Sequence, residues 1–295
     1  MPKGLDKFYT KPEVAKSCVD FLEDLFPQIK EETFLEPSAG QGVFLQYLPN
    51  YLALDIAPDA PNIQKQDFLT FKSEKRDYIA IGNPPFGKRS QLAINFFNKC
   101  ALMCDVIALI FPVSFMKWST HRELNHNFKL LDYMYLDENS FTSNGEDFKV
   151  RTIFQVWVRN KTKYDKGIDL RIKEKPPISH PDFKIWQFNN TAQSADTINK
   201  DWEIAVYRQG YLDYNKIFTR DNYKFIQEKM TSPTKRRQFF FIKPLTDEAR
   251  EIILGMDFNS LAARNISTPG FGKGDFVSYY MELKEKRNLD KLNKN

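Results

Sequence analysis

The chain has 295 residues and a net charge of +5, and its composition is 42% hydrophobic and 27% charged, the balance of a globular protein with a substantial core. No apolar run reaches the roughly 20 residues that a membrane-spanning helix needs, and no apolar signal core stands near the start, so we expect a cytoplasmic protein without a membrane partner. Cys18, Cys100 and Cys104 are too few for a disulfide framework and have no nearby histidine to complete a metal site, so we expect neither.

The charge is distributed unevenly along the chain. Residues 1–159 hold 18 Lys and Arg against 20 Asp and Glu, whereas residues 160–295 hold 25 against 18. A near-neutral half followed by a basic half indicates a catalytic module and a module that binds a polyanion, although ordinary solubility charge would give a similar excess. Together with a proline-rich stretch at 175–181, this predicts two domains, residues 1–165 and 166–295.

The first predicted helix follows the residues Phe8, Tyr9 and Thr10. Thr10 and Glu13 have the spacing of a capping box, and Pro12 falls in the first turn. The apolar residues that follow recur on one helical face and stop before a proline. We therefore expect an amphipathic helix from about residue 12 to residue 25.

A short strand at residues 33–36 leads into the turn Pro37-Ser38-Ala39-Gly40-Gln41-Gly42, after which the apolar spacing predicts a helix over 43–48. A strand, a small-residue turn and a helix form a nucleotide-type loop. The loop has no Gly-Lys-Ser/Thr for a triphosphate, and Leu45 stands where a dinucleotide fingerprint has its third glycine. Such a loop suits S-adenosylmethionine better than NAD.

Two further predicted strands end in acidic residues. Asp55 closes the strand at 51–56, 15 residues after Gly40, and is placed either to bind ribose hydroxyls or simply to open a turn. Asp67 and Phe68 close the third strand, where the carboxylate can accept an adenine amino group and the ring can pack on the base.

The chain is organised around the segment that follows the fourth strand, residues 78–82. Asn83, Pro84, Pro85 and Phe86 cannot extend a strand ladder, because proline has a fixed φ and no N–H. The residue before a proline is held extended, so the direction of the Asn83 side chain is fixed. Alone, the segment is also compatible with a turn that only caps a strand. With free acceptors and a ring, however, it can hold a planar amino group while Phe86 stacks on the attached base.

A helix beginning at Ser90, an apolar strand at 105–111 and two strands at 130–136 and 150–158 complete the first half. We therefore predict an α/β protein with a seven-stranded Rossmann-like sheet, helices on both faces, and a smaller C-terminal α+β domain.

The order of these motifs resembles the S-adenosylmethionine-dependent amino-methyltransferases that act on exocyclic nitrogens, in the gamma arrangement, over residues 7–159. The resemblance implies that Asn83, Pro84, Pro85 and Phe86 are catalytic and that S-adenosylmethionine is the cofactor. It implies a cofactor site made of Tyr9, Thr10, Glu36, Pro37, Ser38, Ala39, Gly40, Asp55, Ile56, Asp67, Phe68 and Asn83.

The resemblance also implies a second aromatic residue that stacks on the target base together with Phe86. Phe141 and Phe148 are both candidates, and we favour Phe141, which comes directly after the sixth strand. We expect the other phenylalanine to be a core residue.

The second half shows no family pattern, so its role is inferred from charge. Lys235, Arg236 and Arg237 precede a predicted strand, and Lys273 lies in a glycine-rich loop. These residues are candidates for phosphate contacts, although a solvated loop before a core strand would look the same. The polar tail from Lys284 onward is expected to lack fixed structure.

The resulting prediction is a site-specific adenine methyltransferase. It would transfer a methyl group from S-adenosylmethionine to N6 of adenine in double-stranded DNA, after the base flips into the Asn-Pro-Pro-Phe pocket. We expect a monomer with no metal, for which a cognate restriction endonuclease is a candidate partner. The alternatives are an RNA adenine-N6 or cytosine-N4 enzyme, a protein glutamine N5-methyltransferase, and an inactive nucleic-acid-binding module.

Overall fold

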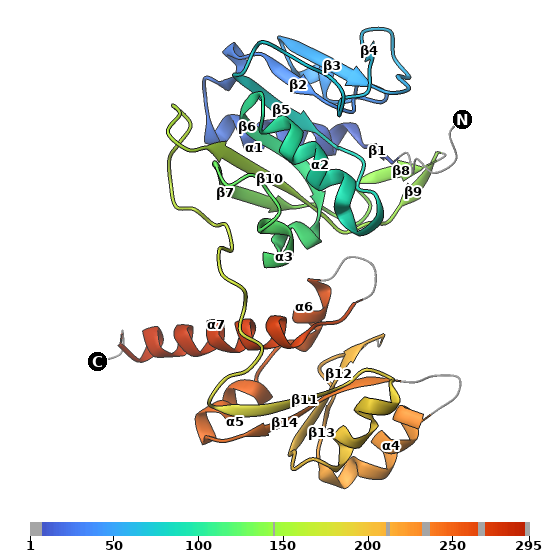
Figure 1. The fold of residues 1–295 in the computed structure, drawn as a ribbon, viewed down its shortest axis with the longest axis vertical. Helices are drawn as coiled ribbons and strands as arrows, with labels where there is room; N and C mark the ends of the chain where they lie inside the picture. The colour runs from blue at the N-terminus through green and yellow to red at the C-terminus, as the bar shows by residue number, and fades with distance from the viewer. Residues whose placement is uncertain (1–7, 144, 211–212, 232–236, 265–268, 293–295) are drawn as a thin grey trace. The chain divides into compact units, whose positions relative to one another are not determined.

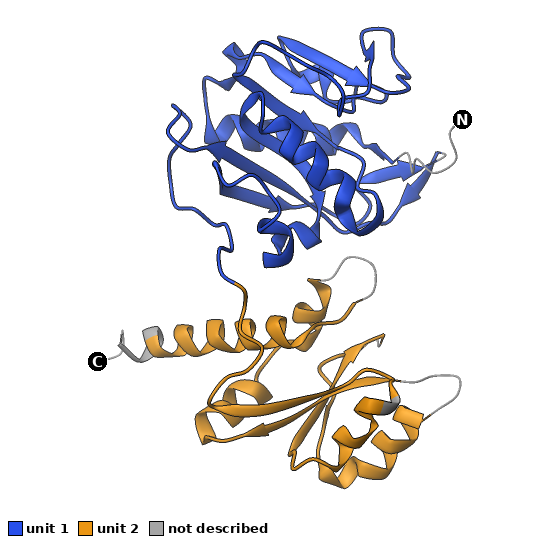
Figure 2. Cartoon of the chain, in the orientation of Figure 1, with its two compact units in different colours: residues 1–174 blue, residues 175–295 orange. Residues whose placement is uncertain are grey.

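The computed structural model describes residues 8–143, 145–210, 213–231, 237–264 and 269–292. The chain divides into two compact units, residues 1–174 and 175–295 (Figure 2). No helix within the described ranges combines the length and the hydropathy that crossing a membrane requires.

The first unit is built on a seven-stranded sheet in the order β4-β3-β2-β5-β6-β10-β7 (Figure 1). Neighbouring strands from β4 to β6 are parallel, and β10 runs antiparallel between β6 and β7. The strands are β2 (Phe34–Glu36), β3 (Tyr51–Asp55), β4 (Gln64–Lys65), β5 (Tyr78–Gly82), β6 (Cys104–Pro112), β7 (Phe128–Tyr135) and β10 (Thr152–Arg159). The predicted seven-stranded sheet is thus confirmed.

Helices cover both faces of this sheet because the central strands are apolar on both sides. Residues 106–111 of β6 are all fully buried. Helix α1 (Pro12–Leu25) packs its buried stripe against Val106, Ala108 and Ile110. On the opposite face of the sheet, helix α2 (Gln91–Cys100) places Phe97 against Phe111 and Trp157. The short helix α3 (Trp118–His121) follows β6.

Two local predictions in this unit are wrong. Residues 43–48 do not form an α-helix but contain only the short 3₁₀ turn η2 (Leu45–Tyr47). Thr10 does not cap α1, because Pro12 takes the first helical position and Lys11 becomes the N-cap. The Thr10 hydroxyl instead accepts a hydrogen bond from Asn83, so a tertiary contact replaces the expected local one.

A small antiparallel sheet lies beside the main one and holds the start of the chain. It consists of β1 (Tyr9–Thr10), β8 (Phe141–Ser143) and β9 (Glu146–Phe148). Thr10 pairs with Phe141, which in turn pairs with Phe148 across the hairpin. This pairing brings residues 9 and 10 next to the ends of the parallel strands.

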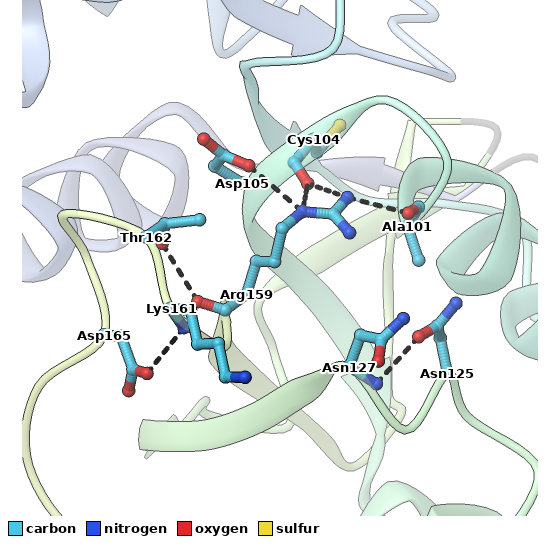
Figure 3. Close-up of polar contacts among 9 residues, drawn as sticks. All are labelled: Ala101, Cys104, Asp105, Asn125, Asn127, Arg159, Lys161, Thr162 and Asp165. Atoms are coloured by element: carbon cyan, nitrogen blue, oxygen red, sulfur yellow. Dashed lines mark hydrogen bonds and ion pairs between the residues drawn. The ribbon is translucent and has the colours of Figure 1, made fainter.

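Arg159, the last residue of β10, ties that strand to the connection between α2 and β6 (Figure 3). Its guanidinium donates to the Cys104 carbonyl at 2.7 and 3.2 Å, to the Ala101 carbonyl at 2.8 Å and to the Asp105 carboxylate at 3.0 Å. It also lies 4.7 Å over the Phe128 ring. Four charge-assisted bonds from one side chain fasten the sheet at this edge.

The second unit is an α+β domain, as predicted. Its antiparallel sheet has the order β11-β14-β12-β13, and residues 239–242 of the central strand are fully buried on both faces. The strands are β11 (Phe183–Phe188), β12 (Ile204–Gln209), β13 (Ile217–Phe218) and β14 (Gln238–Pro244). The helices are α4 (Tyr223–Thr231), α5 (Asp247–Leu254), α6 (Phe258–Ala263) and α7 (Lys273–Leu292). The tail expected to be unstructured therefore belongs to α7 as far as residue 292.

Five further 3₁₀ turns connect these elements. They are η1 (Ile29–Glu31), η3 (Lys88–Ser90), η4 (Val113–Met116), η5 (Ala192–Asn199) and η6 (Arg220–Asn222).

Candidate functional site

The carboxyl ends of β2, β3 and β5 open into a cavity of about 430 Å³, a volume typical of small-molecule sites. Its lining includes every residue that the sequence predicted for the cofactor and for catalysis: Tyr9, Thr10, Glu36, Pro37, Ser38, Ala39, Gly40, Asp55, Ile56, Asp67, Phe68, Asn83, Pro84, Pro85 and Phe86. Five segments that are separate in the sequence therefore meet at one edge of the sheet.

The loop after β2 is held in place by Asp55 at the end of β3. The Asp55 carboxylate accepts the Gly40 N–H at 2.8 Å through one oxygen and the Ala57 N–H at 2.7 Å through the other. Gly40 has φ of +51° and Gly42 has +75°, values that side-chain-bearing residues rarely adopt. The two glycines let the loop turn tightly enough to bring its backbone to the cavity.

The Asn83 corner is fixed from two sides. The Ser38 hydroxyl donates to the Asn83 backbone carbonyl at 3.1 Å, and the Asn83 side-chain nitrogen donates to the Thr10 hydroxyl at 3.2 Å. The side-chain oxygen, Oδ1, is buried and accepts no hydrogen bond from any described residue. An amide oxygen in this state costs about 1–3 kcal/mol, which a ligand N–H would offset.

Glu36 gives the cavity a second unpartnered polar group. The residue is 2% exposed, and its Oε2 has no hydrogen-bond partner within the described residues. Burial, followed by the charge of Asp55, raises the pKa of Glu36 well above its usual value and so favours the protonated carboxyl. A cation in the cavity would favour the ionised form.

The cationic residue in the lining, Lys11, is already paired with Asp147 at 2.8 Å. Three carboxyl groups, Glu36, Asp55 and Asp67, face the same cavity. The Asp55 and Asp67 side chains, together with a Glu36 carboxyl that a cation would help to ionise, favour a positively charged ligand over a pyrophosphate.

Apolar side chains form one wall of the cavity. Ile56 is 51% exposed, while Phe68 and Phe96 are buried with ring centroids 5.2 Å apart. Asp67 lies beside this wall and accepts the Leu69 N–H at 2.9 Å. An apolar wall with an acceptor at its edge is suited to a flat heterocycle with an amino group. Phe96 and Leu92 belong to the lining but were missed, because their spacing on α2 marks them as core residues.

Phe86 lines the cavity, and no ring within the described ranges stacks on it. Phe141 lies on β8 beside β1, is 1% exposed, packs in the core and does not line the cavity. Phe148 stacks on Phe8 with centroids 4.0 Å apart and does not line the cavity either. Phe141 therefore has the position expected of the core phenylalanine, and in this conformation neither ring presents a face to a base.

The predicted phosphate-binding residues lie in the second unit. Lys235 and Arg236 fall outside the described residues. Arg237 donates to the Gly210 carbonyl at 2.7 Å, and Lys273 begins α7, where burial lowers its pKa. Among the described residues, no three His, Cys, Asp or Glu side chains gather as a metal site would require.

Comparison with known proteins gives matches only among solved structures: no family model matches the chain, and no curated protein matches it. A protein from Pyrococcus horikoshii, provisionally named an RNA methyltransferase, is 16% identical, with a TM-score of 0.43 over 52% of this chain and 88% of its own. The methyltransferase subunit of a type I restriction-modification system from Streptococcus thermophilus is also 16% identical, with a TM-score of 0.41 over 55% of this chain. The present chain spans 49% of that subunit.

A third similar structure is the N-methyltransferase NodS from Bradyrhizobium japonicum, solved with S-adenosyl-L-homocysteine. It is 10% identical, with a TM-score of 0.35 over 51% of this chain and 89% of its own. At identities of 10–16% these similarities show the fold alone.

Proposed function

We propose that the protein is an S-adenosylmethionine-dependent methyltransferase that acts on N6 of adenine in double-stranded DNA. The observation that carries this proposal is the Asn83 side chain. It lines the cavity, its orientation is fixed by Thr10 and by the proline that follows, and its Oδ1 has no donor within the described residues. An acceptor held in this way is suited to an incoming amino group.

The proposed cofactor fits the chemistry of the cavity walls. The positive sulfonium and ammonium groups of S-adenosylmethionine match a cavity lined by Glu36, Asp55 and Asp67. Asp55 retains free lone pairs for ribose hydroxyls, and the wall formed by Ile56 and Phe68 can hold the adenine ring. The dinucleotide alternative would place a pyrophosphate among these carboxyl groups.

Catalysis by these residues is a matter of position and of fixed dipoles. The adenine N6 lone pair is delocalised into the ring, which makes the amine a weak nucleophile. Asn83 Oδ1 and the Pro84 carbonyl oxygen each accept one N6 hydrogen, which pulls the nitrogen toward tetrahedral geometry and frees the lone pair. The same two oxygens stabilise the positive charge that develops on N6. Phe86 stacks on the base and holds it in line for the attack.

Glu36, Asp55, Asp67 and the wall formed by Ile56 and Phe68 would hold S-adenosylmethionine, which would supply an electrophilic methyl group on a positive sulfur and would leave as a neutral thioether. The methylated nitrogen then loses one proton to water. Neither a strong base nor a metal is needed in this step, because the leaving group is already activated.

The second unit supports a nucleic-acid substrate. It holds 20 Lys and Arg against 15 Asp and Glu, whereas the first unit holds 23 of each. Contacts from its cations to phosphates would position the duplex, at an affinity that falls with salt. The target adenine must leave the stack to reach the cavity, which costs a few kcal/mol.

A parallel transfer assay tests this function. The protein is incubated with cofactor labelled in the methyl group and with duplex DNA, single-stranded RNA or a protein extract, and the acceptor is digested and analysed by chromatography. We expect the label in N6-methyladenine from DNA. Label found only in RNA, in N4-methylcytosine or in glutamine would replace the proposed substrate, and no transfer at all would leave the catalytic proposal without support.

A further inference from the structure

One end of the four-stranded sheet in the second unit gathers polar side chains from three strands. Phe188, the last residue of β11, pairs with Phe239, and Gln209, the last residue of β12, pairs with Gln238. The carboxyl ends of β11 and β12 therefore lie on either side of the amino end of β14. Asn189, Arg208 and Gln238 meet there, and we call these three residues the strand-end cluster.

Hydrogen bonds fix the orientation of all three side chains. The Arg208 Nη1 donates to Asn189 Oδ1 at 2.9 Å and to Gln238 Oε1. The Nε of the same guanidinium donates to the Phe271 carbonyl at 3.2 Å, and its plane lies 5.5 Å from the centroid of the Phe240 ring. The guanidinium thus draws both amide oxygens toward itself.

The cluster holds a positive charge that no carboxylate neutralises directly. Arg250 pairs with Glu203 and Arg287 pairs with Glu251, whereas no acidic residue in the described ranges forms an ion pair with Arg208. Burial lowers the pKa of Arg208, and the more distant Asp275 opposes that effect only in part. A half-buried cation bonded only to neutral oxygens is costly, so a ligand that brings acceptor atoms would stabilise it.

The cluster offers hydrogen-bond donors and few acceptors. Both amide oxygens are occupied by Arg208, and Gln187 also donates to Asn189 Oδ1. Asn189 Nδ2, Gln238 Nε2 and Arg208 Nη2 have no partner within the part of the chain that the structure describes. Three donors side by side match a base edge that carries acceptors alone. In the major groove this is guanine, with the two acceptors O6 and N7, because adenine and cytosine each present an amino donor there and thymine presents a single acceptor beside its methyl group.

We propose that the strand-end cluster reads a guanine in the major groove of the target duplex. This inference rests on the proposed function, because it assumes a DNA substrate. Two residues predicted to contact phosphates lie close by: Arg237 donates to the Gly210 carbonyl, and Lys273 follows Phe271 by two residues. Contacts from these two cations to phosphates would hold the duplex against the cluster.

Two substitutions test the cluster: one adds a negative charge to it, and the other keeps its positive charge but removes the guanidinium. Asn189→Asp supplies the missing counter-ion to Arg208, so it should leave the melting temperature unchanged or raise it while filling the site with a negative charge. Arg208→Lys retains the charge but loses the planar pair of donors. Arg220→Lys is the matched control: its guanidinium also bonds backbone carbonyls and lies 4.6 Å over the Trp202 ring, but at the other end of β12.

The assay has two readouts on duplexes randomised around an adenine. Methylated positions are sequenced after reaction, and bound duplexes are selected and sequenced in the absence of cofactor. We expect the wild type and Arg220→Lys to prefer guanine at one fixed position. Asn189→Asp and Arg208→Lys should both lose that preference by roughly 5- to 150-fold, with the preferences at other positions intact.

The outcomes separate this inference from the proposed function. If the wild type methylates DNA and both cluster variants retain its guanine preference, the cluster does not read the base and the inference falls alone. A uniform loss of affinity across all sequences would make Arg208 a phosphate contact and would also overturn it. If the wild type methylates no DNA and selects no guanine from the bound pool, both proposals fail.

Discussion

Glu36→Gln gives the sharpest test of the electrostatics of the cavity. The substitution preserves the size and shape of the side chain but removes the ionisable proton. In the wild type, burial and then the Asp55 charge raise the pKa of Glu36 well above the usual 4.5, so the folded protein retains a proton that the unfolded chain releases. Glu36 therefore favours folding most strongly below pH 4.5, and its contribution is lost as the pH rises toward the folded pKa.

The magnitude follows from proton linkage. One extra bound proton in the folded state lowers the free energy of unfolding by about 1.4 kcal/mol for each pH unit between the two pKa values. The difference in unfolding free energy between wild type and Glu36→Gln should therefore fall, at no more than this rate, as the pH rises from 4.5 toward the folded pKa of Glu36. Urea unfolding at a series of pH values measures it. Equal slopes for the two proteins would show that Glu36 is ionised in the folded state and refute the reasoning.

The same substitution has a consequence for ligand binding. A cation in the cavity favours ionised Glu36, so binding of S-adenosylmethionine should release a proton from the wild type and tighten as the pH rises. Calorimetric titration in two buffers of different ionisation enthalpy measures the proton released. Glu36→Gln should release none, and an identical release from both proteins would place the titrating group elsewhere.

Two further predictions concern the frame of the first unit. Arg159→Met removes four hydrogen bonds at the end of β10, so it should lower the free energy of unfolding by about 2–3 kcal/mol without changing cofactor affinity. Lys163→Met removes only the exposed Lys163–Glu32 pair and should change the free energy of unfolding little. Equal losses of stability for the two variants in urea unfolding would contradict this prediction. Gly82→Ala adds a Cβ at φ +140° only 3.1 Å from Glu36 Cγ, so it should lower both the melting temperature and cofactor affinity. The control Gly145→Ala, at φ +83° with nothing within 4 Å, should leave cofactor affinity unchanged. Equal cofactor affinities for the two variants would show that Glu36 tolerates the displacement.

The sequence predicted the sheet well because its strands have local signals, and the residues predicted for the site all line one cavity. The apolar run of β6 is typical of a strand covered on both faces, and Pro84 favours an extended backbone at Asn83, which hydrogen bonds with Ser38 and Thr10 then hold in place. Since the ends of parallel strands meet at one edge, residues that follow β2, β3 and β5 had to lie near one another.

The errors occurred where distant segments compete with local preference. Thr10 has the spacing of a helix cap, but its hydroxyl is bonded to Asn83, 73 residues away. Spacing does not separate Phe141 from Phe148, and the pairing of Phe141 with Thr10, beside which Phe141 is buried in the core, is a contact between distant segments. No pattern in the sequence predicts such pairings between distant segments.

The second unit also contains contacts between distant segments that local sequence patterns do not predict. The polar composition of residues 284–292 suggests disorder, yet Lys284 and Arg287 of α7 bond Asp182 and Glu251 on other elements. The strand-end cluster is equally invisible in the sequence, because Asn189, Arg208 and Gln238 are brought together only by the register of three strands.

The central claim is that Asn83 acts on the target amine and not on the cofactor, and Asn83→Ala tests it most directly. Cofactor affinity is measured by calorimetry, and single-turnover methylation is measured on duplex DNA. We predict affinity within about twofold of the wild type and a rate lowered by roughly 10²–10³, the usual effect of removing one fixed dipole at a developing charge. Equal losses of affinity and rate, or an unchanged rate, would contradict the account.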